Sequence, residues 1–269
     1  MNGKLIKESE LFIPVRDLGY LRGYAVFDFL ITYRGRPFKL DKHIDRLFNS
    51  AKLIGLSIPW SKKEVERRVL KTLAANPRGE KAIKIIVSGG PSDSLIPPKI
   101  PTMIILIDSR HTFPLDSFTK GVGVITVKHN RYAPLAKTNS YIEGVKQVQR
   151  GAKTGAIEPI YYDDARVYEG ATCNIFAVIG GKLITPKTNI LPGITRDTLL
   201  EMVKGVKIHV ADFTHKELMR ASEVFLTASN KEVMPVTKID GKKVGNGKVG
   251  PVTKEMMQQF AEFTASDKW

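Results

Sequence analysis

Three short segments of this chain combine residue types that carry chemistry in proteins. The first, Leu191 to Asp197 (LPGITRD), leads into the apolar helical pattern LLEMV. A glycine directly before a helix start leaves backbone N–H groups accessible, and with the helix dipole and a threonine hydroxyl they can bind a phosphate. An ordinary capped helix after a loop is the other interpretation. The chain contains neither GxxxxGK[ST] nor GxGxxG, so a nucleoside triphosphate or a dinucleotide is not indicated.

The second and third segments contain a lysine and a glutamate. Lys137 ends the loop sequence RYAPLAK, beside apolar neighbours and just before a predicted helix. Desolvation or a nearby cation lowers a lysine pKa and makes the amine a nucleophile or Schiff-base former, whereas a surface lysine stays inert. Glu169 precedes the small-residue stretch GATCN, which feeds a buried strand; a turn carboxylate is the plain alternative. Cys173 is interpreted as a small core residue, because no histidine-based partner motif lies near it.

The elements that must position these residues begin with a predicted strand over Ala25 to Tyr33, turned at Arg34-Gly35 into a short partner around Phe38. Asp41 is the expected N-cap of a helix that ends at Gly55, with apolar residues at helical spacing between them. A second helix is expected over 61–75, followed by strands within 81–90 and 101–109. Residues 1–110 therefore predict a small α/β domain.

An aperiodic segment with Pro114, residues 111–121, is the predicted linker to a large α/β domain over 122–269. Strand-like runs in that domain alternate with helical patterns at about 139–153, 195–204 and 252–263. The strand-like runs cover 123–129, 157–164, 173–180, 182–186, 207–213 and 223–229. This mixture predicts an α/β or α+β domain.

The composition excludes several classes of protein. With 269 residues, 42% of them apolar and 26% charged, the chain is typical of soluble globular proteins. One cysteine rules out an intrachain disulfide and a cysteine-rich zinc site and suits a reducing compartment, and no apolar run reaches signal-peptide or membrane-spanning length. We therefore expect a cytoplasmic protein without a membrane partner and without a metal site.

The charge balance is strongly basic, with 42 Lys plus Arg against 27 Asp plus Glu and a net charge of +15. The basic residues are spread along the chain and interrupted by glutamates, and no known nucleic-acid-binding motif accompanies them. We predict no nucleic-acid partner and keep a basic nucleic-acid-binding protein as the non-enzyme alternative. A positive field equally attracts small carboxylates and phosphates.

Taken in order, five segments resemble the class IV, fold-type IV pyridoxal-phosphate aminotransferases over nearly the whole chain. The segments are His43 to Leu47, Lys137 to Tyr141, Glu169 to Phe176, Gly193 to Arg196 and Glu223 to Val236. The family includes branched-chain aminotransferases, D-amino acid transaminases and aminodeoxychorismate lyase. The resemblance implies a two-domain α/β (α+β) fold of the D-amino acid aminotransferase-like type, a homodimer, and pyridoxal 5'-phosphate held between the domains. It also implies ping-pong transfer of an amino group between an amino acid and a 2-oxo acid.

By this resemblance, four residues meet the cofactor ring. Lys137 is the catalytic residue, which holds the cofactor covalently and shuttles a proton to and from the substrate α-carbon. Glu169 matches the carboxylate that keeps the pyridine nitrogen protonated, so that the ring accepts electrons. Tyr141 resembles the tyrosine that hydrogen-bonds the ring oxygen O3′, and Asn174 is grouped with these cofactor-binding residues.

Four further residues are implied at the cofactor phosphate. Arg46 matches the phosphate-binding arginine of the family, a role suited to the guanidinium fork. Ile194 and Thr195 would add backbone N–H groups and a hydroxyl, and Ser229 aligns with another hydroxyl ligand. The weak phosphate-site signal in LPGITRD thus acquires a ligand.

The segments that define subfamilies depart from the usual patterns. The motif F/Y-G-D-G-V-F-E is replaced by Arg22 to Asp28, and Leu21 stands in place of the branched-chain tyrosine. The GTAA-like turn of branched-chain enzymes is Ala228 to Lys231 here. The V-T-R-G strand end of D-amino acid transaminases, whose arginine holds the substrate carboxylate, is Val87 to Gly90.

A second fixed contact is still needed to hold the substrate α-carboxylate and orient its Cα–H bond. Our hypothesis assigns this role to Arg22, which lies in an otherwise apolar, strand-like stretch where a charge needs a partner. A structural ion pair with Asp17 or Asp28 is the alternative. The other expected substrate-binding residues are Tyr24, Phe27, Ser229 and Asn230. The sequence thus favours a D-amino acid transaminase of atypical sequence, with a branched-chain L-amino acid aminotransferase or aminodeoxychorismate lyase as alternatives.

Overall fold

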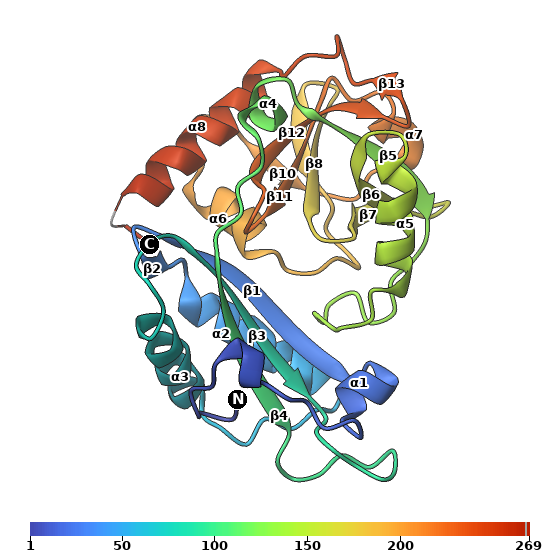
Figure 1. Cartoon of the computed structure of the whole chain (residues 1–269). Coiled ribbons are helices and arrows are strands. Elements are labelled where there is room, and N and C mark those ends of the chain that lie inside the picture. The colour runs from blue at the N-terminus through green and yellow to red at the C-terminus, as the bar shows by residue number, and fades with distance from the viewer. Residues whose placement is uncertain (267) are drawn as a thin grey trace. The chain divides into compact units, whose positions relative to one another are not determined.

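The computed structural model describes residues 1–266 and 268–269, and its contacts divide the chain into two compact units (Figure 1). Unit 1 comprises Met1–His111 and Leu135–Ser140, and unit 2 comprises Thr112–Pro134 and Tyr141–Trp269. The chain therefore leaves unit 2 once, for the short segment that contains Lys137. In the part of the chain that is described, no helix is long and apolar enough to cross a membrane.

Unit 1 is an antiparallel four-stranded sheet in the order β2-β1-β3-β4, packed against two helices. Its elements are η1 (Glu8–Glu10), α1 (Leu18–Arg22), β1 (Ala25–Tyr33), β2 (Arg36–Pro37), α2 (Leu40–Leu53), α3 (Lys62–Ala74), β3 (Lys81–Ser88) and β4 (Thr102–Ser109). Alternate residues of β1, Val26 and Leu30, join Ile44 and Leu47 of α2 in one buried apolar cluster. The period of two in the strand thus meets the helical period of α2.

A buried ionic cluster joins β1 to α2 within this apolar layer. Asp28 is fully buried and accepts hydrogen bonds from Arg46 Nε at 2.9 Å and Nη2 at 2.8 Å. His43 Nδ1 lies 2.7 Å from the same carboxylate. Burial alone would raise the pKa of Asp28, but Arg46 and His43 beside it hold the pKa well below its usual range. Burial likewise lowers the pKa of His43, so the imidazole is kept neutral.

Unit 2 contains a nine-stranded mixed sheet in the order β10-β9-β8-β11-β12-β5-β6-β7, with β13 paired to β12. Its strands are β5 (Val122–Lys128), β6 (Ala156–Tyr162), β7 (Val167–Gly170), β8 (Asn174–Ile179), β9 (Lys182–Thr185), β10 (Ile208–Val210), β11 (Glu223–Ala228), β12 (Glu232–Ile239) and β13 (Lys242–Lys243). Its helices are α4 (Leu115–Thr119), α5 (Ile142–Ala152), α6 (Ile194–Met202), α7 (His215–Leu218) and α8 (Pro251–Ala265). The parallel pair β5 and β6 is joined through α5, the crossover that parallel strands require.

Most of the predicted elements are confirmed, and β1 has the predicted bounds. Three predictions are wrong. Asp41 is not the N-cap of α2, because Lys39 takes that position in the left-handed conformation and the helix begins at the buried Leu40. Arg22 lies at the end of helix α1 rather than in a strand. The segment expected to be irregular between the domains contains helix α4.

Strands β7 and β12 were not predicted. β7 has only four residues and is buried throughout, so it shows no alternation of polar and apolar residues. β12 contains Pro235, which argues against a central strand, and the pairing of β12 with β5 is irregular between Val236 and Lys238. Both strands form because neighbouring strands of the sheet provide partners for their backbone hydrogen bonds.

We expect Asp28→Asn to lower the free energy of unfolding by about 3–5 kcal/mol, because it leaves the buried Arg46 without its counter-charge. Since the pKa of Asp28 is lowered on folding, its stabilisation is present above about pH 4 and is lost as the pH falls towards the lowered value. Urea unfolding between pH 3 and 7 would measure both effects. The exposed pair of Asp45 and Lys62 provides the control, since Asp45→Asn should cost about 1 kcal/mol or less. Equal losses in the two variants would contradict this account.

Candidate active site

The backbone of Lys137 is held by β1 and α2 within unit 1. The Phe27 N–H donates to the Lys137 carbonyl at 2.9 Å, and the Asn139 N–H donates to Ala25 O at 3.1 Å. The Lys137 N–H donates to the buried Ser50 Oγ at 3.0 Å. These bonds run on both sides of a single bridge between Val26 and Thr138. The segment is thus attached like a short extra strand, which fixes the origin of the lysine side chain.

The side chain of Lys137 lies beside Phe27, another predicted site residue. Lys137 Nζ is 4.6 Å from the centroid of the Phe27 ring, within the range of a cation–π contact. Both side chains are half-buried. The structure therefore brings together the predicted catalytic lysine and a residue expected to contact the substrate.

Arg46 is buried on α2, with two of its three guanidinium nitrogens donating to Asp28. The hydrogen bonds from Nε and Nη2 to Asp28 fix the orientation of the guanidinium plane, so this orientation depends on Asp28.

Glu169 lies in β7 of unit 2 and is 3% exposed. Its Oε1 accepts from Arg131 Nη1 at 2.5 Å, and its Oε2 accepts from the Leu191 N–H at 2.9 Å and from Asn174 Nδ2 at 3.2 Å. These donors compensate both carboxylate oxygens for the water that burial removes. The alternative interpretation of Glu169 as a turn carboxylate is wrong, since the residue is part of a buried strand.

Asn174 connects Glu169 to the start of α6. Its amide also donates to Leu191 O at 3.0 Å, and a Cβ added to Gly193 would lie 1.8 Å from Asn174 Oδ1. Only glycine fits there. Gly193 is the N-cap of α6, and no side chain caps the helix, so the first-turn N–H groups, including those of Ile194 and Thr195, lack helical partners. The close approach explains the glycine in LPGITRD.

The remaining predicted cofactor residues of unit 2 lie at element ends. Ser229 and Asn230 form the turn between β11 and β12 and are half-buried. Tyr141 is the residue before α5. Thr227, in register with Asn174 across β8 and β11, has a buried hydroxyl without a hydrogen-bond partner among residues 1–266 and 268–269. Such an orphaned polar atom, beside the cradle at Gly193, fits a polar group bound from outside the chain.

The structure changes the argument for Arg22. Its side chain is exposed, so the premise of a buried charge was wrong, and it donates to the Leu21 carbonyl at 3.0 Å. Neither alternative partner is available, because Asp17 accepts from Ser88 and Thr102 while Asp28 is held within the α2 cluster. Arg22 lines a surface pocket of about 300 Å³. The pocket is lined by Arg16, Leu18, Leu21, Arg22, Ser92, Asp93, Ser94 and Leu95.

Tyr24 points into the packing of unit 1. Its hydroxyl donates to Ile54 O at 3.2 Å, and its ring packs against the apolar cluster beneath α2. Burial raises the pKa of this tyrosine. A Cβ added to Gly89 would lie 2.7 Å from its ring, so the side chain is closely enclosed. The hydroxyl proton of Tyr24 is therefore used within unit 1.

The sequence predicted no role for Arg131, although it lies in the segment RYAPLAK. Its partner Glu169 is 38 residues away in sequence, and no spacing pattern relates the two. The sequence suggested Asp28 only as a partner for Arg22. The spacing of three residues between His43 and Arg46 on one helix was the signal that these two side chains could meet at a common partner.

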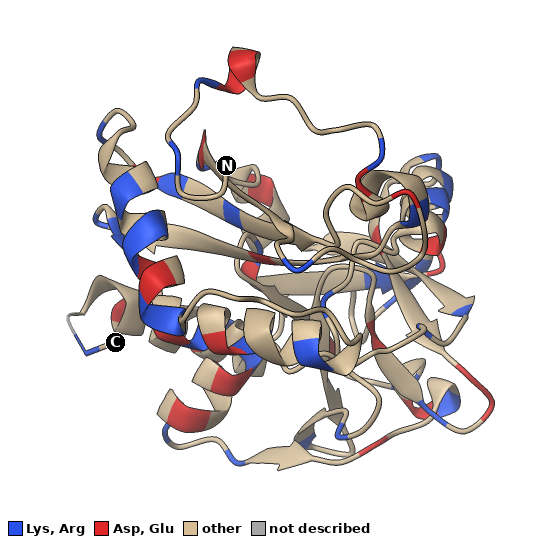
Figure 2. Ribbon diagram, turned by 90° about the horizontal axis from the view of Figure 1, so that it is seen from below, with Lys and Arg blue, Asp and Glu red and all other residues tan. Residues whose placement is uncertain are grey.

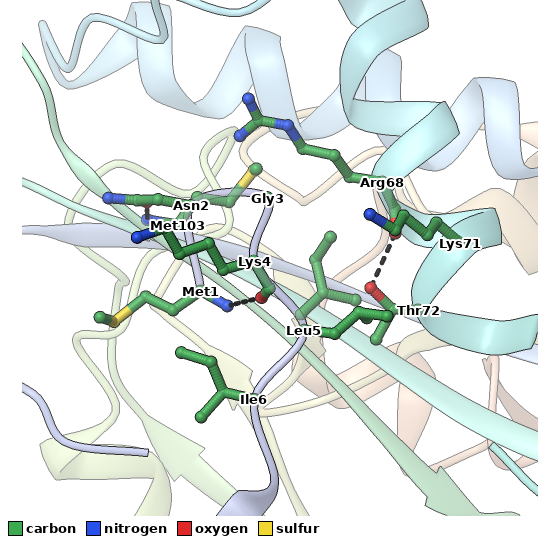
Figure 3. A pocket seen from close by; sticks show the side chains of 11 residues that line it. Met1, Asn2, Gly3, Lys4, Leu5, Ile6, Arg68, Lys71, Thr72 and Met103 are labelled. Carbon is green, nitrogen blue, oxygen red and sulfur yellow. Dashed lines mark hydrogen bonds between the residues drawn. The ribbon is translucent and has the colours of Figure 1, made fainter. Parts of the chain in front are cut away.

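Other surface features do not coincide with these residues. Figure 3 shows a pocket of about 50 Å³ formed by the N-terminal segment, Arg68, Lys71, Thr72 and Met103, and none of the predicted site residues lines it. Lys and Arg are scattered over the ribbons of both units with Asp and Glu between them (Figure 2). The net positive charge is therefore distributed rather than gathered in one stripe.

Matches to known proteins now give the family. The profile described as "Amino-transferase class IV" matches residues 25–239. A protein of Methanocaldococcus jannaschii, provisionally named a branched-chain-amino-acid aminotransferase, is 33% identical over 100% of this chain and 96% of its own. The D-alanine aminotransferase of Listeria monocytogenes is 30% identical over 97% of this chain and 94% of its own. The crystal structure of the branched-chain aminotransferase from the thermophilic archaeon Thermoproteus uzoniensis, with norvaline, superposes with a TM-score of 0.90. It is 26% identical and covers 99% of this chain and 94% of that one.

The fold is that of a fold-type IV pyridoxal-phosphate enzyme, as the resemblance implied. The chain belongs to the class IV aminotransferases, and pyridoxal 5'-phosphate is the cofactor. The residues present fit that group, since unit 2 combines a buried carboxylate with an uncapped helix start and a buried hydroxyl that has no partner among the described residues.

We expect Gly193→Ala to weaken cofactor binding about tenfold, because the new Cβ displaces Asn174 from Glu169 and Leu191. Titration of the apoprotein with pyridoxal phosphate, followed by absorbance, gives the dissociation constant. Gly123→Ala is the matched control, since a Cβ there meets its nearest neighbour at an ordinary 3.4 Å. Unchanged affinity in Gly193→Ala would show that the close contact is unimportant for binding.

Proposed function

We propose that this aminotransferase moves the amino group of a D-amino acid to a 2-oxo acid. The observation that carries the proposal is Arg22, which pairs with no carboxylate in the described chain and lines a pocket in unit 1. An arginine without an internal counter-charge is suited to a substrate carboxylate. The 30% identity to a D-alanine aminotransferase over nearly the full length supports the same assignment.

When bound, pyridoxal phosphate supplies an electron sink for the substrate α-carbon. In the proposed site, Lys137 would hold the cofactor through Nζ and would serve as the base and acid that moves the α-proton. Its backbone hydrogen bonds to Phe27 and Ser50 keep the origin of this side chain in one place. Glu169 would pair with the ring nitrogen and keep it protonated, while Arg131 and the Leu191 N–H donate to the Glu169 carboxylate. Tyr141 would donate a hydrogen bond to the ring oxygen O3′.

The phosphate of the cofactor is assigned to Arg46, the N–H groups of Ile194 and Thr195, the Thr195 hydroxyl and the Ser229 hydroxyl. The uncapped start of α6 supports this assignment, because helix N-termini attract anions. Asn174 holds Gly193 and Glu169 in fixed relation, so that the ring and phosphate contacts in unit 2 are coupled. Phe27, Asn230, Ser229 and Tyr24 are proposed to line the substrate side.

Transfer of amino groups from branched-chain L-amino acids is the second candidate. It is favoured by the relative from Methanocaldococcus jannaschii, which matches the whole of this chain at 33% identity. The two functions differ in which hand of the donor places its α-proton near Lys137, so the donor's stereochemistry separates them.

We further propose that the enzyme is a cytoplasmic homodimer. Large apolar side chains that are 64 to 78% exposed on unit 1 support a covered surface, since monomers rarely expose so many. These residues are Phe12, Val15, Tyr20, Leu95, Ile96 and Ile100. The single cysteine suits the reducing cytoplasm.

Amino-donor specificity tests the proposal directly. We expect the purified holoenzyme to transaminate D-alanine or D-glutamate and to leave L-leucine unused; the reverse preference would favour the branched-chain function. Arg22→Ala should raise the Michaelis constant for the D-donor about tenfold or more while leaving cofactor affinity unchanged. Arg16→Ala, which removes a neighbouring arginine already paired with Asp93, is the control. An unaltered Michaelis constant in Arg22→Ala would end its assignment as the carboxylate-binding residue.

The role of Glu169 is tested by Glu169→Gln. An amide cannot hold a proton on the ring nitrogen as a carboxylate does, so we expect kcat to fall about 100-fold. The variant should retain the fold, because the amide keeps part of the hydrogen bonding. Glu262→Gln, on the exposed face of α8, should leave kcat unchanged. Steady-state rates at saturating pyridoxal phosphate provide the measurement, and a Glu169→Gln enzyme of normal kcat would contradict the assignment.

A further inference from the structure

A second buried ion pair lies in unit 2, between residues that no step above uses. Lys231 is 4% exposed and Glu158, in β6, is 2% exposed. Lys231 Nζ is 3.1 Å from Glu158 Oε2 and donates to Thr172 Oγ1 at 2.7 Å. The same carboxylate accepts the Thr172 N–H at 2.6 Å and the Thr172 hydroxyl at 2.9 Å. One buried carboxylate thus gathers a lysine and a threonine from two different turns.

These two turns are the ones to which cofactor contacts are assigned. Lys231 ends the turn between β11 and β12, two residues after Ser229, and its N–H closes the turn by donating to Ala228 O at 3.1 Å. Thr172 lies in the turn between Glu169 and Asn174. The ion pair therefore ties the turn assigned to the phosphate to the segment assigned to the ring nitrogen.

A charged lysine at this buried place in the turn needs compensating contacts. In the GTAA-like turn of branched-chain enzymes the last position is alanine, and here it is Lys231. A buried ammonium costs free energy unless its geometry and hydrogen bonds compensate for lost hydration. Burial would lower the pKa of Lys231, but Glu158 beside it raises the pKa, so the lysine stays charged. Its charge holds the turn rather than performing chemistry.

The surroundings leave little room for another arrangement. A Cβ added to Gly170 would lie 2.5 Å from Cys173 Sγ and 3.0 Å from Glu158 Cγ. Cys173 is fully buried, and burial raises the pKa of its thiol well above the usual value. The neutral thiol fills the space beside the ion pair. Close packing around a fixed charge pair gives the turn one defined position.

We propose that Lys231 is a positioning residue, which anchors the Ser229 turn to Glu158 and Thr172 so that the Ser229 hydroxyl is held ready for the cofactor phosphate. This inference rests on the proposed phosphate role of Ser229. It assigns to Lys231 no contact with the cofactor or the substrate. Its effect should therefore depend on whether the ligand has a phosphate.

The test compares pyridoxal phosphate with pyridoxal, which has the same ring and aldehyde but no phosphate. Lys231→Met keeps most of the side-chain length and removes the charge. We expect it to raise the dissociation constant for pyridoxal phosphate about tenfold and to leave that for pyridoxal unchanged within about twofold. Binding to apoprotein is measured well below the unfolding temperature of each variant. Glu158→Gln should act in the same direction, and the double variant should be no worse than the single ones.

Three further variants make the outcome decisive. Glu223→Gln alters a buried carboxylate at the other end of β11 that accepts from the Val252 and Thr253 N–H groups, so it should lower stability without changing the ratio of the two constants. If Lys231→Met does not fold, Thr172→Val removes the bridging hydroxyl and should shift the ratio about threefold. Ser229→Ala should reproduce the selective loss.

Each result has one meaning. An equal loss for both ligands, or none, in Lys231→Met overturns the inference. If Ser229→Ala leaves the ratio unchanged, the phosphate role of Ser229 fails and the inference fails with it. If the wild-type protein transaminates normally while Lys231→Met has a normal ratio, the proposed function stands and only the inference about Lys231 falls.

Discussion

The need to satisfy a buried carboxylate organises unit 2. An ionised carboxylate deprived of water is tolerable only when donors replace its hydration. Glu169 takes one from Arg131 in the loop after β5, one from the Leu191 backbone before α6, and one from Asn174 at the start of β8. Because these donors come from three separate segments, the carboxylate cannot be satisfied unless the segments converge. Glu169 thus holds these three segments of unit 2 together.

In unit 1, too, a buried carboxylate fixes the positions of other groups. There Asp28 projects from β1 and fixes two side chains of α2, one of which is the arginine assigned to the phosphate. The apolar face of α2 determines which side of the helix meets the sheet, and the fork of Arg46 on Asp28 fixes that rotation more closely. The neighbouring Ser50 then has its hydroxyl in reach of the Lys137 N–H. Packing supplies the stability, and the ionic contacts supply the positions.

The pairing of cations with carboxylates explains why the strongly basic composition is a poor guide to function. Arg46 and Lys231 are buried and Arg131 is partly buried, and each of these cations is paired with a carboxylate. The many exposed lysines and arginines are scattered and make ordinary surface pairs, which contribute little. A long-range positive field still favours the approach of anionic substrates and of a phosphorylated cofactor.

The sequence by itself determined the family, the main elements and the identity of most cofactor-site candidates. Ala25 to Tyr33 alternates as a strand must, α2 and α3 show helical spacing, and the glycine of LPGITRD marks a helix start. These are local patterns, readable because neighbouring residues share one environment. The partner of Glu169, the exposure of Arg22 and the pairing of Glu158 with Lys231 were decided only by tertiary structure. Pairing joins residues 38 to 73 positions apart, and the free energy of a buried charge depends on which groups the fold brings to it, a quantity no local pattern contains.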